Sequence, residues 1–105
     1  MSPSERRLLP NRRAHTLIDF QSMGMKFTAS VSRDSTGKIL ELFVDNHKAG
    51  SAIGTLVRDA AIIFSFAAQY GADAEAIRRA LGRSSDGRAL GPIAEALDRI
   101  RGEQP

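Results

Sequence analysis

Residues 45–70 read DNHKAGSAIGTLVRDAAIIFSFAAQY, and the rest of the chain is organised around this stretch. Small and polar residues open it, and neither proline nor glycine interrupts residues 55–70. Every side chain from Ala60 to Ala68 is apolar except that of Ser65. A helix that is apolar around most of its circumference is a buried helix. We therefore predict that this stretch forms the central core helix of a small domain, about twenty residues long, and that residues 60–70 organise its packing.

The same stretch is long enough to cross a bilayer, but Arg58 and Asp59 lie inside it and would be costly in hydrocarbon. The N-terminus lacks the apolar segment of a signal peptide. We therefore expect a soluble cytoplasmic protein that does not associate with a membrane.

Length and composition indicate one globular domain, because the 105 residues are 42% hydrophobic and 26% charged. The absence of cysteine excludes disulfides, thiolate metal sites, cysteine nucleophiles and thiyl-radical chemistry carried by this chain. The net charge of +3 is concentrated in residues 1–13, which hold four arginines and one glutamate. We predict a basic extended arm over residues 1–13, a single domain over residues 14–102 and a short tail over residues 103–105.

Three segments with period-two alternation precede the long helix and predict strands over residues 15–21, 25–32 and 38–44. Two further helices follow: Asp73 caps one that ends before Gly82, and Pro92 begins the other. The predicted fold class is α+β, with a three-stranded antiparallel meander followed by a long buried helix and two shorter helices, in the order β-β-β-α-α-α.

A three-stranded sheet covered by helices on one face leaves two open edges and one open face. Strict alternation in the third strand places Ile39 and Phe43 on that uncovered face. Exposed edges and apolar side chains favour pairing with another protein surface. We therefore expect a homodimer or a partner-bound protein.

The junction between the third strand and the long helix is the first candidate site, formed by Asn46, His47, Lys48, Gly50 and Ser51. A helix N-terminus presents free backbone N–H groups and partial positive charge, to which His47 and Lys48 add. A phosphate or carboxylate is the ligand expected there, although the order is not that of a P-loop. The alternative interpretation is structural, with Ser51 capping the helix, Gly50 forming the turn and both basic side chains in solvent.

Arg58 is a further candidate ligand for an anion, because an arginine inside this apolar helix can hold a ligand phosphate. Adjacent residues on a helix point about 100° apart, so Arg58 and Asp59 are expected to have different partners. A structural ion pair at the domain edge is the alternative role for Arg58. The two histidines, His15 and His47, lack the compact spacing of a metal site, and no nucleophile–base pair is recognisable. We predict neither a catalytic residue nor a metal site.

Arginines in the N-terminal arm form the last candidate site. Guanidinium groups bind phosphates and carboxylates through paired hydrogen bonds, so the arm is a candidate contact for nucleic acid or for a protein partner. Four arginines are few for strong duplex binding, since affinity scales with the number of phosphates neutralised. The alternative is an arm that is solvated or packs on the domain. Its members are Arg6, Arg7, Arg12 and Arg13.

Several segments together match the pattern of one known family. They are Glu41-Leu42-Phe43-Val44, Lys48, Gly50-Ser51, Ile53-Gly54, Leu56, Ser65, Gln69-Tyr70-Gly71 and residues 75–81. With these positions the chain resembles, over about residues 7–101, the TSCPD domain, which is found near the C-terminus of adenosylcobalamin-dependent ribonucleotide reductases and as short free-standing bacterial proteins. The arm LPNRRAH and the segment GRALGPIAEALDRI look like the free-standing members.

The resemblance implies a domain fold and an association with deoxynucleotide synthesis, but it supplies no catalytic residue. Adenosylcobalamin belongs to the related full-length enzymes, and we expect this chain to bind no cofactor. Our leading hypothesis is a non-catalytic accessory or regulatory module that binds a nucleotide, a ribonucleotide reductase or another protein. The alternatives are a small nucleic-acid-binding protein with a basic arm and, by family label only, ribonucleoside-diphosphate reductase activity. Cysteine thiols carry ribose reduction in that family, so the missing cysteines oppose the last alternative.

Overall fold

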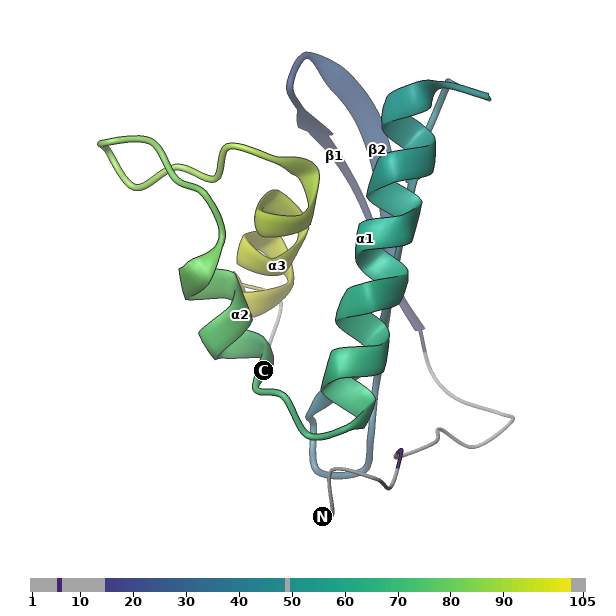
Figure 1. Ribbon diagram of the computed structural model, residues 1–105, viewed down its shortest axis with the longest axis vertical. Coiled ribbons are helices and arrows are strands. Elements are labelled where there is room, and N and C mark those ends of the chain that lie inside the picture. Colours follow the sequence, from purple (N-terminus) through teal and green to yellow (C-terminus); the bar gives the residue numbers. More distant parts are fainter. Residues whose placement is uncertain (1–5, 7–14, 49, 103–105) are drawn as a thin grey trace.

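The computed structural model describes residue 6, residues 15–48 and residues 50–102. Its elements follow the predicted β-β-β-α-α-α order, and the α+β fold class is confirmed (Figure 1). Apart from Arg6, the predicted arm over residues 1–13 and the tail over residues 103–105 lie outside the described residues. The elements are β1 (His15–Ser22), β2 (Met25–Arg33), β3 (Ile39–Asn46), α1 (Ala52–Gln69), α2 (Ala74–Ala80) and α3 (Pro92–Gly102).

The three strands form an antiparallel sheet in the order β1-β2-β3. Met23 and Gly24 connect the first two strands, and both have positive φ angles, 55° and 73°. Two-residue turns of this kind match the right-handed twist of paired strands, so this turn fixes the register. The second turn is held by Asp34, whose carboxylate accepts hydrogen bonds from the backbone N–H groups of Thr36 and Lys38.

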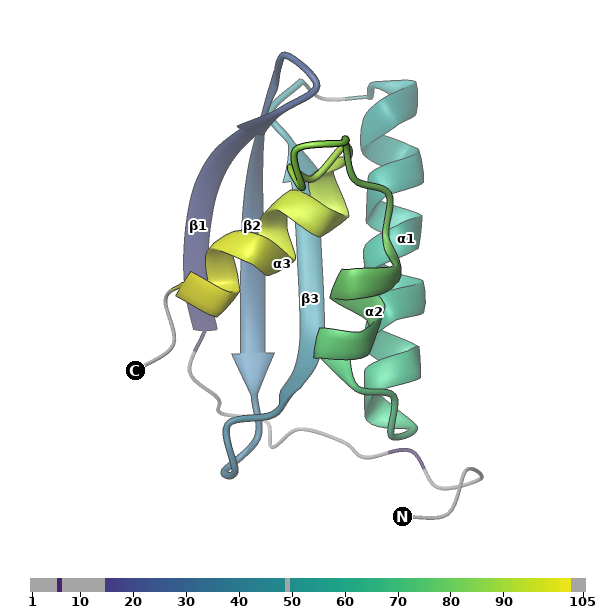
Figure 2. The same cartoon turned by 90° about the vertical axis from the view of Figure 1, so that its left-hand side faces the viewer.

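One face of the sheet carries the core, and α3 crosses it (Figure 2). Phe20 on β1 and Phe27 on β2 are cross-strand partners, and their rings stack with centroids 5.6 Å apart. The core cluster also contains side chains of β2, β3, α1 and α3, namely Ala29, Val31, Ile39, Leu42, Val44, Val57, Ala61, Phe64, Ala68, Ala96, Leu97 and Ile100.

The helix α1 lies beside β3 and covers an edge that the sequence predicted to be open (Figure 2). Ser65 accepts a hydrogen bond from the Leu42 N–H at 2.9 Å, and its hydroxyl lies 3.0 Å from the Leu42 carbonyl oxygen. One turn further on, the Gln69 side-chain amide donates to the Leu40 carbonyl oxygen at 3.0 Å. Backbone groups that an unpaired edge strand would present to another chain are therefore satisfied by two helix side chains. The prediction of two open edges is wrong for β3.

The prediction that α1 is buried around most of its circumference is also wrong. One side of the helix, which includes Val57, Ala61 and Phe64, is buried in the core. The opposite side is exposed although it is apolar: the exposed fraction is 69% for Ile63 and 45% for Phe66. The sheet edge and the other helices offer one surface to pack on, so an apolar helix of 18 residues keeps a free side.

By length and composition alone, α1 also meets the criteria for a membrane-spanning helix, and 33% of it is buried inside the domain. The core helices of soluble proteins meet the same criteria. The compact α+β architecture agrees with a soluble protein.

The third strand departs from strict alternation near its start. A β-bulge between Ser32 and Arg33 shifts the register and pairs Arg33 with Ile39. An extra residue in one strand turns the following side chains toward the other face. Ile39 is consequently buried in the core, whereas Phe43 remains 41% exposed on the uncovered face as predicted.

An ion-pair cluster joins α2, α3 and the segment between them. The Arg83 guanidinium donates to both carboxylate oxygens of Asp98, at 2.9 and 2.7 Å, and Arg78 donates to the same carboxylate at 2.9 Å. The hydrogen bonds from Arg83, and to a smaller extent the bond from Arg78, lower the pKa of Asp98 to about 2. Arg78 also pairs with Glu75 and lowers the pKa of that carboxyl group. The cluster therefore joins the short helix α2 to α3 by charge, in addition to the apolar packing of Ala74 and Ile77 against the core.

Candidate binding site

The residues of the predicted junction site lie close together, and most of their polar groups form hydrogen bonds with one another. Ser51 caps α1 by accepting a hydrogen bond from the Gly54 N–H at 2.9 Å. The Asn46 side-chain oxygen accepts the Lys48 N–H at 2.9 Å and the Ser51 hydroxyl at 3.2 Å. Gly50 has a φ of 73°, which favours glycine at this turn. Ser51 and Gly50 thus form the cap and the turn, as the structural interpretation predicted, and Asn46 joins them, whereas the expectation that His47 only faces solvent is wrong because its ring contacts Thr28.

His47 lies beside this turn and belongs to a polar chain that sequence reasoning missed. The Thr28 hydroxyl donates to Asp19 at 2.6 Å, and the His47 Nε2 atom lies 2.7 Å from the same hydroxyl. Because a hydroxyl has one proton, and Thr28 donates it to Asp19, the Nε2–H group of His47 is the donor in the contact with Thr28. Asp19 and Thr28 are cross-strand partners, so their meeting follows from the sheet register, which the two strand patterns alone do not specify.

A shallow depression of about 350 Å³ lies next to the hydrogen-bonded side chains of Asp19, Thr28 and His47, between β1, β2 and the end of β3. Asp19, Gln21, Lys26 and His47 supply its polar lining. Lys26 brings positive charge to the same corner of the domain as Lys48, whose side chain is exposed. The positive charge of Lys26 favours one anionic group at this corner, and the negative charge of Asp19 repels a second one.

The Arg58 guanidinium is ion-paired, so it adds no unpaired positive charge to the junction. Its guanidinium donates to a single oxygen of Asp45 at 3.2 and 2.9 Å, and both side chains are more than half exposed. Asp59 points to a different side of α1, so the prediction of separate partners is confirmed for Arg58. Among residues 6, 15–48 and 50–102, Asp59 forms no ion pair. Arg58 is therefore the structural ion pair that the alternative interpretation described.

The two histidines do not share a site. His15 lies near the opposite end of β1, where its Nδ1 atom is 2.9 Å from the Ser32 hydroxyl. In the part of the chain that the structure describes, no three histidine, aspartate or glutamate side chains come together as candidate metal ligands.

Of the four arm arginines, only Arg6 belongs to the described residues; Arg7, Arg12 and Arg13 lie outside them. The Arg6 guanidinium lies over the Phe66 ring, 4.1 Å from its centroid, and its Nε–H donates to the Gln69 side-chain oxygen. Arg6 is thus packed on the exposed side of α1, which is the packing role predicted as the alternative to nucleic-acid contact.

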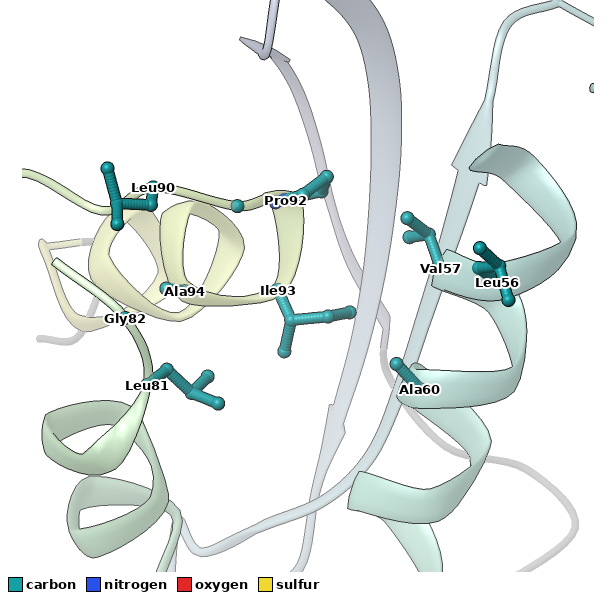
Figure 3. A pocket seen from close by; sticks show the side chains of 10 residues that line it. Leu56, Val57, Ala60, Leu81, Gly82, Leu90, Pro92, Ile93 and Ala94 are labelled. Atoms are coloured by element: carbon teal, nitrogen blue, oxygen red, sulfur yellow. The ribbon is translucent and has the colours of Figure 1, made fainter. Parts of the chain in front are cut away.

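An apolar groove is the second surface that sequence reasoning missed. It lies between α1 and the segment that joins α2 to α3, and its volume is about 370 Å³ (Figure 3). Leu81 and Ile93 on one wall point toward Val57 and Ala60 of α1 on the other (Figure 3). Leu90 at the rim is 58% exposed. The remaining lining residues are Leu56, Gly82, Gly91, Pro92 and Ala94.

One signal in the sequence could have indicated this groove. The apolar residues of α1 occupy more of the helix circumference than one sheet edge can cover, and short helices offer little further surface.

No family model, curated protein or solved structure matches the sequence.

Proposed function

We propose that this chain is a non-catalytic accessory module, cytoplasmic and without a cofactor, that binds a protein partner through the groove between α1 and the α2–α3 segment. The observation that carries the proposal is the groove itself, whose walls are apolar and which remains open in the folded domain. Monomeric soluble domains rarely expose large contiguous apolar surface unless it contacts another molecule. A partner that inserts a leucine or an aromatic side chain would satisfy the groove.

The resemblance to the TSCPD domain supports a place in deoxynucleotide synthesis and makes an adenosylcobalamin-dependent ribonucleotide reductase the first partner to test. The groove fits this role better than the junction does. At the junction, Asn46 and Ser51 are used internally and Arg58 is neutralised by Asp45. Protein binding is therefore the proposed activity.

The test is capture of a purified adenosylcobalamin-dependent ribonucleotide reductase by the full chain, compared with the Leu90→Asp variant. Leu90 lies at the rim and is 58% exposed, so the substitution adds charge to the groove with little change in the fold. Leu17→Asp is the matched control, because Leu17 is 70% exposed on β1, away from the groove. Loss of capture with Leu90→Asp alone supports the proposal. Absence of capture by the native chain, or equal capture by all three proteins, refutes it.

A nucleotide bound at the junction is a second candidate function. It is favoured by Lys26 and His47, which line the depression beside the junction, and by the exposed Lys48, which precedes the N-terminus of α1 in the chain. Binding would raise the unfolding temperature in proportion to the logarithm of nucleotide concentration. Lys48→Ala should remove that increase, whereas Lys38→Ala, near the opposite end of β3, should keep it. An increase that is the same in both variants, or absent from the native chain, excludes this candidate.

A further inference from the structure

The outer face of α1 carries a regular stripe of mostly apolar side chains, which shares Leu56 with the rim of the groove. Its members recur at alternating spacings of four and three residues, and all of them are exposed. This spacing is that of the a and d positions of a coiled coil, whose side chains pack against a second helix. The stripe consists of Ala52, Leu56, Asp59, Ile63, Phe66 and Tyr70.

The one charged residue in this stripe is Asp59. It forms no ion pair within residues 6, 15–48 and 50–102. A positive charge lies further along the same face, where Arg6 sits over the Phe66 ring. Asp59 and Phe66 are seven residues apart, about 10.5 Å along the helix axis, so Asp59 and Arg6 of one chain are separated by about two turns. The face therefore carries a negative and a positive charge at different levels.

We propose that the outer face of α1 binds a second copy of this chain, with the two α1 helices antiparallel. In an antiparallel pair centred at Ala61, every position of the stripe meets another position of the stripe. Ala52 meets the partner's Tyr70, Leu56 meets the partner's Phe66, and Asp59 meets the partner's Ile63. This arrangement is isologous, so each contact occurs twice.

The charges fit this register. The partner's Phe66 lies one layer beyond the partner's Ile63, a distance of three residues or about 4.5 Å along the axis. Asp59 therefore comes within reach of the partner's Arg6, and the symmetry gives two such pairs. A parallel pair would instead place the two Asp59 carboxylates opposite each other in one layer, which opposes that orientation. A membrane surface is disfavoured because Asp59 lies in the middle of the stripe.

The contact is small. An α-helix of 18 residues is about 27 Å long and about 10 Å wide, so the paired seam is well below the roughly 800 Å² per partner of a standard interface. We therefore expect a dimer that dissociates in the micromolar range. It leaves the groove beside α1 accessible from the side of Leu81 and Ile93.

The first test is sedimentation equilibrium of the full chain over concentrations that span the micromolar range. The native chain should be in monomer–dimer equilibrium and Ile63→Lys should be monomeric. Leu17→Lys is the matched control and should dimerise normally, because Leu17 is 70% exposed and Ile63 69% exposed. A native chain that stays monomeric, or an Ile63→Lys variant that dimerises as the native chain does, overturns the proposal.

The second test is charge exchange, which distinguishes a second copy from any other occupant. Asp59→Arg or Arg6→Asp alone should weaken dimerisation about five-fold, since each removes two exposed ion pairs. The double variant should recover the native affinity, because the two charges then face each other in reverse. A double variant no stronger than either single variant refutes the pairing.

The orientation has its own test, because the chain contains no cysteine. Ala52→Cys mixed with Tyr70→Cys should form a disulfide-linked dimer under mild oxidation, whereas either variant alone should not. Cross-linking of either variant with itself would indicate a parallel pair and overturn the proposal. The Leu90→Asp variant, which tests the groove, should dimerise normally, so the failure of either proposal can be recognised separately.

Discussion

Replacing Ser65 by alanine tests whether α1 is held to the sheet edge by hydrogen bonds as well as by apolar packing. Ser65 is 6% exposed, and its hydroxyl accepts the Leu42 N–H at 2.9 Å. Its own proton has two acceptors, the carbonyl oxygens of Leu42 and Ala61, at 3.0 and 2.9 Å. The substitution removes all three contacts and leaves the Leu42 N–H without a partner in the interior.

The expected cost follows from this buried N–H. A buried donor left unsatisfied costs about 1–3 kcal/mol. Alanine has a higher helix propensity than serine, which returns about 0.5 kcal/mol. The free energy of unfolding should therefore fall by about 1.5 kcal/mol, equivalent to a decrease of roughly 6–10 °C in the unfolding temperature of a domain of this size. Cavity formation adds little, because only one oxygen atom is removed.

Urea unfolding at one fixed protein concentration measures this difference. The control is Thr55→Ala, on the exposed side of the same helix, which should change stability by less than about 0.5 kcal/mol. Amide hydrogen exchange provides a local measurement, because exchange at Leu42 should accelerate more than at its neighbours in β3. If Ser65→Ala is as stable as the native chain and the Leu42 amide remains protected, the hydrogen bond does not hold this edge.

Three further predictions concern the ion-pair cluster and the start of α1. Asp98→Asn should destabilise the domain by on the order of 1 kcal/mol at neutral pH, because the carboxylate pairs with Arg83 in a partly exposed site. The pKa of Asp98 is lowered to about 2, so this stabilisation is present above its usual value near 4 and is lost as the pH falls from about 4 to 2. Urea unfolding across that window should show the native and Asp98→Asn curves converging, and a constant difference would contradict the assignment. Ser51→Ala should cost about 1 kcal/mol in thermal unfolding and Ser51→Gly only a few tenths, since the hydroxyl caps the Gly54 N–H; equal losses would exclude the cap. Gly50→Ala should lower the free energy of unfolding by about 1–2 kcal/mol because of the positive φ of 73°, and no steric clash contributes, since an added Cβ meets no atom within 4 Å. Gly50→Asn should cost less. Unchanged stability in both variants would show that the turn can readjust.

Local patterns were sufficient for the elements and their order. Alternation predicted the three strands, and Asp73 and Pro92 marked the starts of α2 and α3. These predictions succeeded because periodicity, capping and turn formation depend on residues close together in the chain. The cap at Ser51 was predicted as one of two interpretations, and the structure supports it.

Predictions that depended on contacts distant in the sequence were less successful. The bulge beside Ser32 buries Ile39, and no local signal marks it. Asp19, Thr28 and His47 come from three separate strands or their ends, so only the sheet register brings them together. The resemblance to the TSCPD domain remains a prediction, as do the proposed accessory function and its partners.

Within residues 45–70, some features follow from the local sequence, and others depend on contacts with distant parts of the chain. Its composition determined that residues 52–69 form a helix and that a large part of that helix must leave water. Apolar side chains lie on both sides of this helix, however, so composition could not specify which side of α1 would be covered or by which element. The tertiary structure decided this by placing α1 at the β3 edge, where Ser65 and Gln69 bond to the strand and Ile63 and Phe66 remain exposed. One sheet edge can cover only one side of a helix, so the remaining apolar side of α1 stays available for the proposed partners.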